Sequence, residues 1–423
     1  MPSVTFDSVE LVNSTYAPKY IKHESAPERE LILLDLAREG GSVLITEKYG
    51  VKVITVSGSL KATSASTLEI AIDSFKELFS RIAKNLDIGW GSGTRRYVAT
   101  CVKHTFDRSH FNINFIPWTA QFVVPTGIGE DISETTLVSN QNFTAVSYAS
   151  SMSFLGSNKP NPRIRVKCGV SATDPKGLSI ENTDNGERIV ITRASGFGAN
   201  KYFEMDCRLK TVEYDGSAID FYGVLPDWIV GANDYKIMIG DIVDQAFTET
   251  TPSVDENPIY GGYLVAQSFS VPYTNATYQG IKLYLRRFGT LANDLVVEIW
   301  NDIGGEPNPA SKVSNATFSL AKATPTTSWV WYTLNSASVF TLSANTKYWI
   351  VLTSAGGDAS NYWAIPYRTG AYATYKRGNK SQEYTGSWSD QPNQDMLFQL
   401  LYGGKADAAK TYYFDVYYFK RFL

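Results

Sequence analysis

A single amphipathic segment constrains this chain most, because it interrupts a sequence that otherwise alternates like β-strands. Between Ser64 and Lys84, apolar residues recur at steps of three or four: Leu68, Ile72, Phe75, Phe79 and Ile82. This spacing places them on one face of an α-helix. Ser66 and Glu69 stand three apart and predict a capping box, and Lys84 is expected in the last turn. The apolar face must be buried, so we expect it to pack on the neighbouring strands.

The rest of the chain predicts a mainly β protein with antiparallel sheets. Period-two alternation marks several short segments, among them residues 163–168, 177–182, 188–193, 202–207 and 235–239. Hairpin-forming dipeptides separate some of them, as at Asn185-Gly186 and Asp215-Gly216. Strands spaced about ten residues apart are typical of an antiparallel sandwich.

The length of 423 residues exceeds what one core usually organises, so two or three domains are expected. Two polar stretches, 126–140 and 248–258, are read as linkers. They divide the chain into three predicted units, at residues 1–130, 141–247 and 258–403. The aromatic segment 411–423 predicts one more strand, which we expect to return to the second unit; a strand of the third unit is the alternative.

Four short motifs of the first unit resemble the phage distal tail protein family. They are Gly58-Ser-Leu, the Ser-Ala-x-x-Leu-Glu start of the helix, Arg95-Arg96-Tyr97-Val98 and Asn114-Phe-Ile-Pro-Trp, in that order. The resemblance implies that residues 1–130 form an α+β ring (belt) domain, assembled as a hexamer. In that family, an Arg/Gly-rich hairpin before the helix helps to build the belt. The resemblance also implies contacts with tail tube and tail hub proteins, and a place at the tail tip of a virion made in the host bacterial cytoplasm.

The other two units carry resemblances of their own. The second, with Ile180-Glu-Asn and Leu225-Pro…Gly231-Ala-Asn, resembles the galectin-like β-sandwich that follows the ring domain in distal tail proteins. The third contains six of the nine Trp, and its Val297-Glu-Ile-Trp and Tyr348-Trp-Ile-Val-Leu strands resemble jelly-roll carbohydrate-binding modules. These likenesses imply accessory units that bind host-surface polysaccharide.

Composition and spacing argue against several other classes. A net charge of −3 does not favour binding to nucleic acid or to an anionic membrane surface. The three Cys are widely spaced, and His104 and His110 stand six apart, so neither a disulfide framework nor a metal site is predicted. We expect no cofactor. The N-terminus has no signal-peptide pattern and the chain has no long apolar run, so we expect no membrane insertion.

Paired carboxylates are the one feature that favours catalysis. Glu204 with Asp206, and Asp294 with Glu298, lie on the same faces of predicted strands, and a glycosidase needs two carboxyl groups across a cleft. Alternating strands also place many acids on solvated faces, so we expect no enzymatic activity.

Aromatic and basic side chains between residues 361 and 388 are the candidate glycan-binding residues. Flat rings with a few polar groups suit the recognition of sugars, and the candidates are Trp363, Tyr367, Arg368, Tyr372, Tyr375 and Trp388. The alternative is that these aromatics pack the sandwich and contact a neighbouring subunit.

Three functions follow from the sequence. The first is a structural distal tail protein, which forms a ring between tail tube and tail tip or baseplate and displays glycan-binding modules. The second is a stand-alone lectin or adhesin. The third is a glycan-degrading enzyme.

Overall fold

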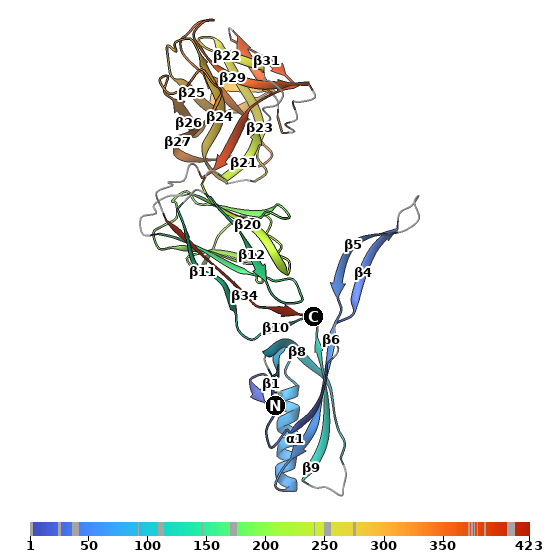
Figure 1. Ribbon diagram of the computed structural model, residues 1–423. Helices are drawn as coiled ribbons and strands as arrows, with labels where there is room; N and C mark the ends of the chain where they lie inside the picture. The colour runs from blue at the N-terminus through green and yellow to red at the C-terminus, as the bar shows by residue number, and fades with distance from the viewer. Residues whose placement is uncertain are drawn as a thin grey trace.

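The structure is a computed structural model that describes residues 3–23, 27–35, 42–91, 93–108, 114–144, 147–169, 176–240, 242–248, 255–273, 276–370, 373, 375, 377–378, 380–384, 386–403 and 411–423. These residues form one helix and a series of sheets whose strand pairs are antiparallel, which confirms the mainly β fold. Three separate groups of sheets follow one another along the length of the molecule, and we call them the first, second and third units (Figure 1).

The first unit is a nine-stranded sheet with helix α1 (Ala65–Phe79) packed on one face. Its main path has the order β2-β1-β7-β8-β9-β6-β3, and β10 adds to β8 and to β35. The strands are β1 (Ser3–Phe6), β2 (Val9–Glu10), β3 (Pro18–His23), β6 (Lys52–Lys61), β7 (Lys84–Trp90), β8 (Gly93–Phe106), β9 (Phe115–Val124), β10 (Gly129–Asp131) and β35 (Arg421–Phe422).

Helix α1 buries the face that its periodicity predicts, and its core is aromatic. Phe75 is fully buried and its ring lies 4.0 Å from that of Phe79 and 5.0 Å from that of Trp118 in β9. Leu68 and Ile72 are buried as well. The fifth predicted member is wrong, because the helix ends at Phe79 and Ile82 is 73% exposed.

The start of α1 also differs from the prediction. The N-cap is Ser64, whose hydroxyl accepts from the backbone N–H of Thr67, while the Thr67 hydroxyl accepts from the backbone N–H of Ser64. Thr67 thus takes the position expected for Glu69, and the helix begins two residues earlier than a cap at Ser66 would allow. Lys84 lies beyond the helix, as the first residue of β7.

A hairpin projects from the first unit, and we call it the arm. It consists of β4 (Arg29–Asp35) and β5 (Ser42–Tyr49), which form a two-stranded sheet of their own. Figure 1 shows the arm extending away from the body of the molecule. Its two ends meet at the base, where the backbone N–H of Gly50 donates to the carbonyl of Glu28 over 2.7 Å.

The second unit consists of two sheets that share one hydrophobic core. One sheet has the order β11 (Thr135–Phe143), β34 (Tyr412–Tyr418), β13 (Arg163–Cys168), β16 (Tyr202–Asp206), β17 (Thr211–Tyr214) and β18 (Ser217–Ala218). The other has the order β12 (Ser147–Phe154), β20 (Gly231–Ile239), β14 (Gly177–Asn182), β15 (Glu187–Thr192) and β19 (Tyr222–Gly223). The stretch 126–140, read as a linker from its polarity, therefore contains β10 and part of β11.

The third unit also has two sheets and the largest core. One contains β21 (Ile242–Phe247), β33 (Phe398–Tyr402), β24 (Thr277–Phe288), β29 (Tyr362–Thr369) and β22 (Asp255–Ile259), with β27 (Val330–Thr341) and β32 (Gln394–Met396) beside this path. The other has the order β26 (Glu306–Leu320), β25 (Leu295–Ile303), β28 (Lys347–Thr353), β23 (Tyr263–Ser270), β30 (Lys380–Tyr384) and β31 (Ser387–Gln391).

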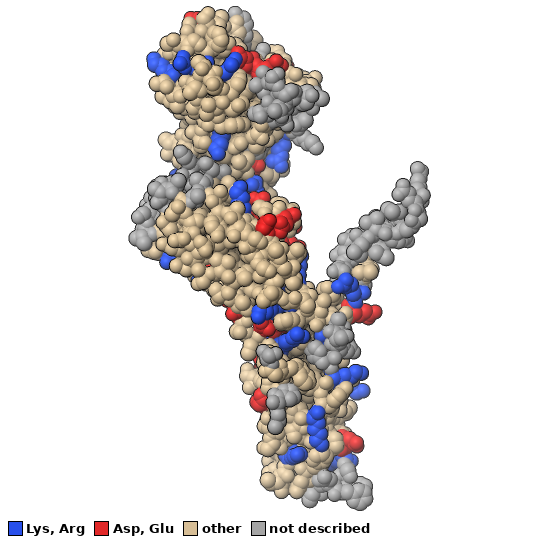
Figure 2. Space-filling model, viewed as in Figure 1, with Lys and Arg blue, Asp and Glu red and all other residues tan. Residues whose placement is uncertain are grey.

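The last residues of the chain connect the second unit to the first. After the third unit the chain returns through β34, which lies between β11 and β13 of the second unit. It then ends in β35, which pairs with β10 of the first unit. The molecule is elongated, with the third unit at one end and α1 near the other (Figure 1). Lys, Arg, Asp and Glu are scattered over the face seen in Figure 2.

Candidate functional site

Two of the six candidate glycan-binding residues lie inside the third unit. Trp363 is 1% exposed, and its indole N–H donates to the carbonyl of Asn293 over 3.0 Å. Arg368 is 3% exposed and stands opposite Asp395 in the pairing of β29 with β32. Neither side chain offers a surface to a sugar in this conformation.

The other candidates are dispersed. Tyr375 packs edge-on against Phe398 of the core, at 5.2 Å between ring centroids. Tyr367 is half-buried in β29. Tyr372 lies outside the described residues.

Trp388 belongs to a second, smaller core on the outer face of the third unit's sheet that runs from β26 to β31. This core contains Trp300 and Trp349, and Trp388 meets Trp300 edge-on at 6.4 Å. Strands β26 and β31, at opposite ends of this sheet, contact each other, so the sheet curls around these rings. The described candidates thus do not form one platform, and glycan binding by them stays a prediction.

The sequence reading missed a row of aromatic side chains on the outer face of the other sheet. Tyr284 of β24 stacks with Trp331 at 5.1 Å and with Trp329 at 5.7 Å. Further along, Phe288, 48% exposed, stacks with Tyr362 at 5.1 Å. The alternation within β24 could have indicated this row, because Tyr284 and Phe288 lie on the face opposite to that of the buried Leu283 and Leu285. We call Tyr284, Phe288, Trp329, Trp331 and Tyr362 the aromatic row.

A polar pair lies within the aromatic row. The Arg286 guanidinium stacks on Trp329 at 4.7 Å, and its Nε donates to Glu256 over 2.9 Å. The hydroxyl of Tyr362 donates to the same carboxylate over 3.2 Å. The row therefore combines aromatic rings with fixed hydrogen-bonding groups.

The carboxylates considered for catalysis hold local structure. Glu204 accepts from Arg163 over 2.9 Å and from Arg165 over 2.6 Å. Burial opposes its charge, but these hydrogen bonds outweigh burial and lower the pKa of Glu204. Asp206 accepts from the backbone N–H groups of residues 208 and 209.

The second carboxylate pair is engaged in the same way. Glu298 forms an ion pair with Lys312 over 2.8 Å and accepts from the indole N–H of Trp300. Asp294 accepts from the backbone N–H of Lys322 over 2.9 Å. Each of these four carboxylates thus holds local structure through an ion pair or a hydrogen bond.

The first unit has surfaces suited to assembly. Among the described strands, β3 pairs only with β6 and β2 only with β1, so the sheet is open at both ends of its path. The face of β8 away from the core exposes Val98 and Val102 by 42% and 60%. In the arm, Leu31 and Ile32 are 50% and 42% exposed. Open edges and exposed apolar side chains favour pairing with another chain.

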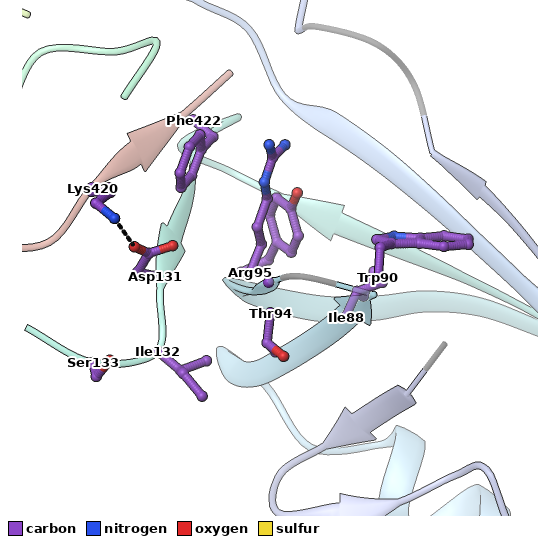
Figure 3. A pocket seen from close by; sticks show the side chains of 11 residues that line it. Ile88, Trp90, Thr94, Arg95, Asp131, Ile132, Ser133, Lys420 and Phe422 are labelled. Carbon is purple, nitrogen blue, oxygen red and sulfur yellow. Dashed lines mark ion pairs between the residues drawn. The ribbon is translucent and has the colours of Figure 1, made fainter. Parts of the chain in front are cut away.

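A cavity of about 660 Å³ lies where the first unit meets the C-terminal residues, and we call it the junction cavity. Its walls come from the tip of the β7–β8 hairpin, from the segment after β10 and from the end of the chain (Figure 3). Trp90 and Arg95 line the hairpin side, Ile132 the middle, and Lys420 and Phe422 the C-terminal side.

Ion pairs and backbone hydrogen bonds hold the C-terminal wall of this cavity. Glu130 in β10 forms ion pairs with Arg421 over 3.2 Å and with Arg208 of the second unit over 3.1 Å. Lys420 pairs with Asp131 over 3.7 Å, and the carbonyl of Arg421 accepts from the backbone N–H groups of residues 157 and 158. The last residues therefore bind both units at once.

Within the described ranges, no group of three or more His, Cys, Asp or Glu side chains is arranged to hold a metal ion. The one helix of this part of the chain is too short to cross a bilayer.

No protein-family model matches the chain, and no curated protein sequence matches it. Among solved structures it is similar to the Dit protein (gp 19.1) of phage SPP1, described as a paradigm of the hub adsorption apparatus in phages that infect Gram-positive bacteria. The two share 14% identity with a TM-score of 0.42, over 56% of this chain and 98% of that one.

Two further structures are similar at lower scores. The phage P2 baseplate, in its activated conformation with Ca, matches at 9% identity and a TM-score of 0.30, over 56% of this chain and 97% of that one. Cwp84, a surface layer associated protein of Clostridium difficile with cysteine protease and lectin-like domains, matches at 9% identity and a TM-score of 0.25, over 59% and 64%. Phage Dit and baseplate proteins are thus among the structural neighbours of this chain.

Proposed function

We propose that this chain is a structural protein of a phage tail tip, and that its first unit assembles with copies of itself into a ring. The observation that carries this proposal is that a single copy of the first unit leaves its sheet edges and its arm without partners among the described strands. Among the strands that the structure describes, its sheet is open at both ends of its path, and its arm stands apart from the body. An isolated two-stranded hairpin is marginally stable in water, so the arm favours a partner surface.

The sequence resemblance to distal tail proteins supplies the details of the proposal. It implies six copies in the ring, tail tube and tail hub proteins as the neighbours, and the virion tail tip as the location. The role is architectural and needs no catalytic residue. The second and third units then project from the ring, which is consistent with their succession along the molecule (Figure 1).

Electron microscopy and sedimentation of the purified full chain test the ring. We expect the wild-type chain to form closed rings. A variant in which residues 29–48 are replaced by a two-residue Gly turn should remain folded, because the ends of the arm already meet at Gly50, and should assemble at least about tenfold more weakly.

The matched control is Val224→Ser, which changes an apolar side chain of the second unit that is 59% exposed. It should assemble like the wild type. A wild-type chain that stays monomeric at high concentration would rule out the ring. Normal assembly of the variant that lacks residues 29–48 would show that the arm makes no contact needed for the ring.

A second, accessory function is binding of host polysaccharide by the third unit, and the aromatic row is the observation that favours it. Sugars present apolar C–H faces and hydroxyls together, which suit aromatic rings beside fixed polar groups. Display in several copies would strengthen weak binding through avidity.

A glycan array probed with the full chain tests this accessory function. Trp331→Ala should abolish binding, whereas Ile303→Ser, at an exposed position of the other sheet, should keep it. If Trp331→Ala kept binding and Trp388→Ala lost it, the aromatic row would not be the binding site. The site would then lie among the candidates predicted from the sequence.

A further inference from the structure

We propose that Glu256 makes the aromatic row selective for neutral polysaccharides, because it neutralises Arg286, the cation that lies between the rings. This inference rests on the accessory function proposed above and names the class of polysaccharide that the row binds. That class is a linear glycan whose units carry hydroxyl groups but no carboxylate, phosphate or sulfate.

The aromatic row consists of two groups of rings with a gap between them. In one group, the rings of Trp331 and Trp329 lie 5.1 Å and 5.7 Å from that of Tyr284. In the other, Phe288 and Tyr362 stack at 5.1 Å. Tyr284 and Phe288 stand four residues apart on the same face of β24, which corresponds to about 13 Å along the strand. A ligand that contacts both groups is therefore longer than one sugar ring and passes over the residues in the gap.

Arg286 and Glu256 occupy this gap as an ion pair. Arg286 lies midway along this stretch of β24, and its Nε and Nη2 both donate to one oxygen of the Glu256 carboxylate. The Tyr362 hydroxyl donates to the other oxygen over 3.2 Å, and the guanidinium lies 4.7 Å from the centre of the Trp329 ring. The side chains of Arg286 and Glu256 are still 30% and 28% exposed, so a ligand on the row can reach them.

This ion pair suits the hydroxyl groups of a glycan better than its charged groups. A sugar hydroxyl can accept from the guanidinium and donate to the carboxylate, so it satisfies both members of the pair. A carboxylate or sulfate on the glycan could accept from Arg286, but it would also lie next to the negative charge of Glu256, which opposes its binding. Glu256 thus excludes acidic units at the place where an unneutralised arginine would attract them.

The other two cations of β24 lie outside the gap. Arg287 follows the alternation of the buried face, and its guanidinium donates to two backbone carbonyls. Lys282 lies on the outer face, but it is four residues from Arg286, or about 13 Å along the strand. This separation exceeds the screening length of about 8 Å at physiological salt. Within β24, Arg286 is therefore the cation that a ligand meets between the two groups of rings.

Binding of the full chain to matched neutral and acidic polymers tests this inference. The probes are dextran, xylan and linear mannan, each immobilised beside its own carboxymethylated derivative, so that the two members of a pair differ in charge. The wild type should bind a neutral polymer, and it should bind the carboxymethylated form of that polymer at least about tenfold more weakly. Its affinity for the neutral polymer should change less than about twofold between roughly 0.05 and 0.5 M salt.

Two substitutions at the ion pair should change this preference in opposite directions. Glu256→Gln keeps an acceptor oxygen but removes the negative charge, so the preference for the neutral polymer should fall to about twofold or less. Arg286→Gln leaves the carboxylate unneutralised, so the preference should increase. The matched control is Asp255→Asn, which removes the same charge at the adjacent exposed position of β22 and should keep the wild-type preference. The ratio of the two affinities is the readout, because a general loss of stability would weaken both.

The possible outcomes separate this inference from the accessory function. Opposite changes of the ratio in the two variants support the inference. Tighter binding of the carboxymethylated polymers by the wild type, or an unchanged ratio in either variant, would overturn it while leaving polysaccharide binding intact. Binding retained in Trp331→Ala would move the site away from the aromatic row and would equally overturn it. No binding by the wild type to any member of the panel would overturn the inference together with the accessory function.

Discussion

At the residue scale, Phe75 is the side chain on which the first unit most depends. It is fully buried, and its ring contacts those of Phe79, Phe106 and Trp118, which come from the helix and from two strands of the sheet. It therefore joins the two layers of the unit, and its loss would leave a cavity between them.

We predict that Phe75→Ala destabilises the first unit by about 3–5 kcal/mol. Ile70→Ala, on the exposed face of the same helix, should change the unfolding free energy by less than about 0.5 kcal/mol. Hydrogen exchange of the amides in β6 and β9 measures both effects within the full chain. Equal protection in the two variants would contradict the assigned packing.

A second residue-scale prediction concerns pH. The arginines that bind Glu204 lower its pKa below the ordinary value of 4.5, so its stabilising effect is present above that pH and is lost as the pH falls through the lowered pKa. The second unit should lose stability on acidification below about pH 4.5. In Glu204→Gln this loss of stability should be smaller. Thermal unfolding of both proteins between about pH 3 and 7, a range in which carboxylates titrate, would measure the difference.

At the element scale, the first turn of α1 shows that a capping pattern in the sequence can differ from the cap that forms. Two serines near the helix start can act as N-caps, and the sequence reading chose Ser66 because Glu69 completes a familiar capping box. In the structure Ser64 has the extended backbone of an N-cap, and Thr67 returns the hydrogen bond. Glu69 is instead free to pair with Arg108.

We predict that Ser64→Ala destabilises the first unit by about 1 kcal/mol, because it leaves a helix N–H without its acceptor. Ser66→Ala lies inside the first turn, where alanine favours the helix, and should be neutral or slightly stabilising. Comparison of the two by thermal unfolding would decide between the two caps. A larger loss for Ser66→Ala would restore the original assignment.

At the scale of the whole molecule, the C-terminal residues decide how the first two units are joined. Strand β35 adds to the first sheet through β10, while Arg421 accepts from and donates to backbone groups of residues 157–159 in the second unit. Gly156 lies close against Arg421, since a Cβ there would stand 2.7 Å from its carbonyl oxygen.

We predict that deletion of residues 419–423 uncouples the two units without unfolding either, because each keeps its own core. Limited proteolysis should then cut faster within residues 125–134, the connection that β35 covers. Gly156→Ala should give a weaker form of the same effect. Gly186→Ala shares the backbone strain of a positive φ but has open space around it, so it should not give this effect. An unchanged cleavage pattern in the deletion variant would contradict the coupling.

The sequence by itself determined the mainly β class, the single helix and most of its buried face, because periodicity directly reports which side chains share a face. It also indicated that the aromatic strand near the C-terminus belongs to a folded unit. It could not determine the exposure of Trp363 or Arg368, since the same residue types suit a core and a binding surface. Only the tertiary structure determined that Trp363 and Arg368 are buried. It alone also formed the aromatic row and the junction cavity. Each depends on side chains that are far apart in the chain and meet only when strands pair.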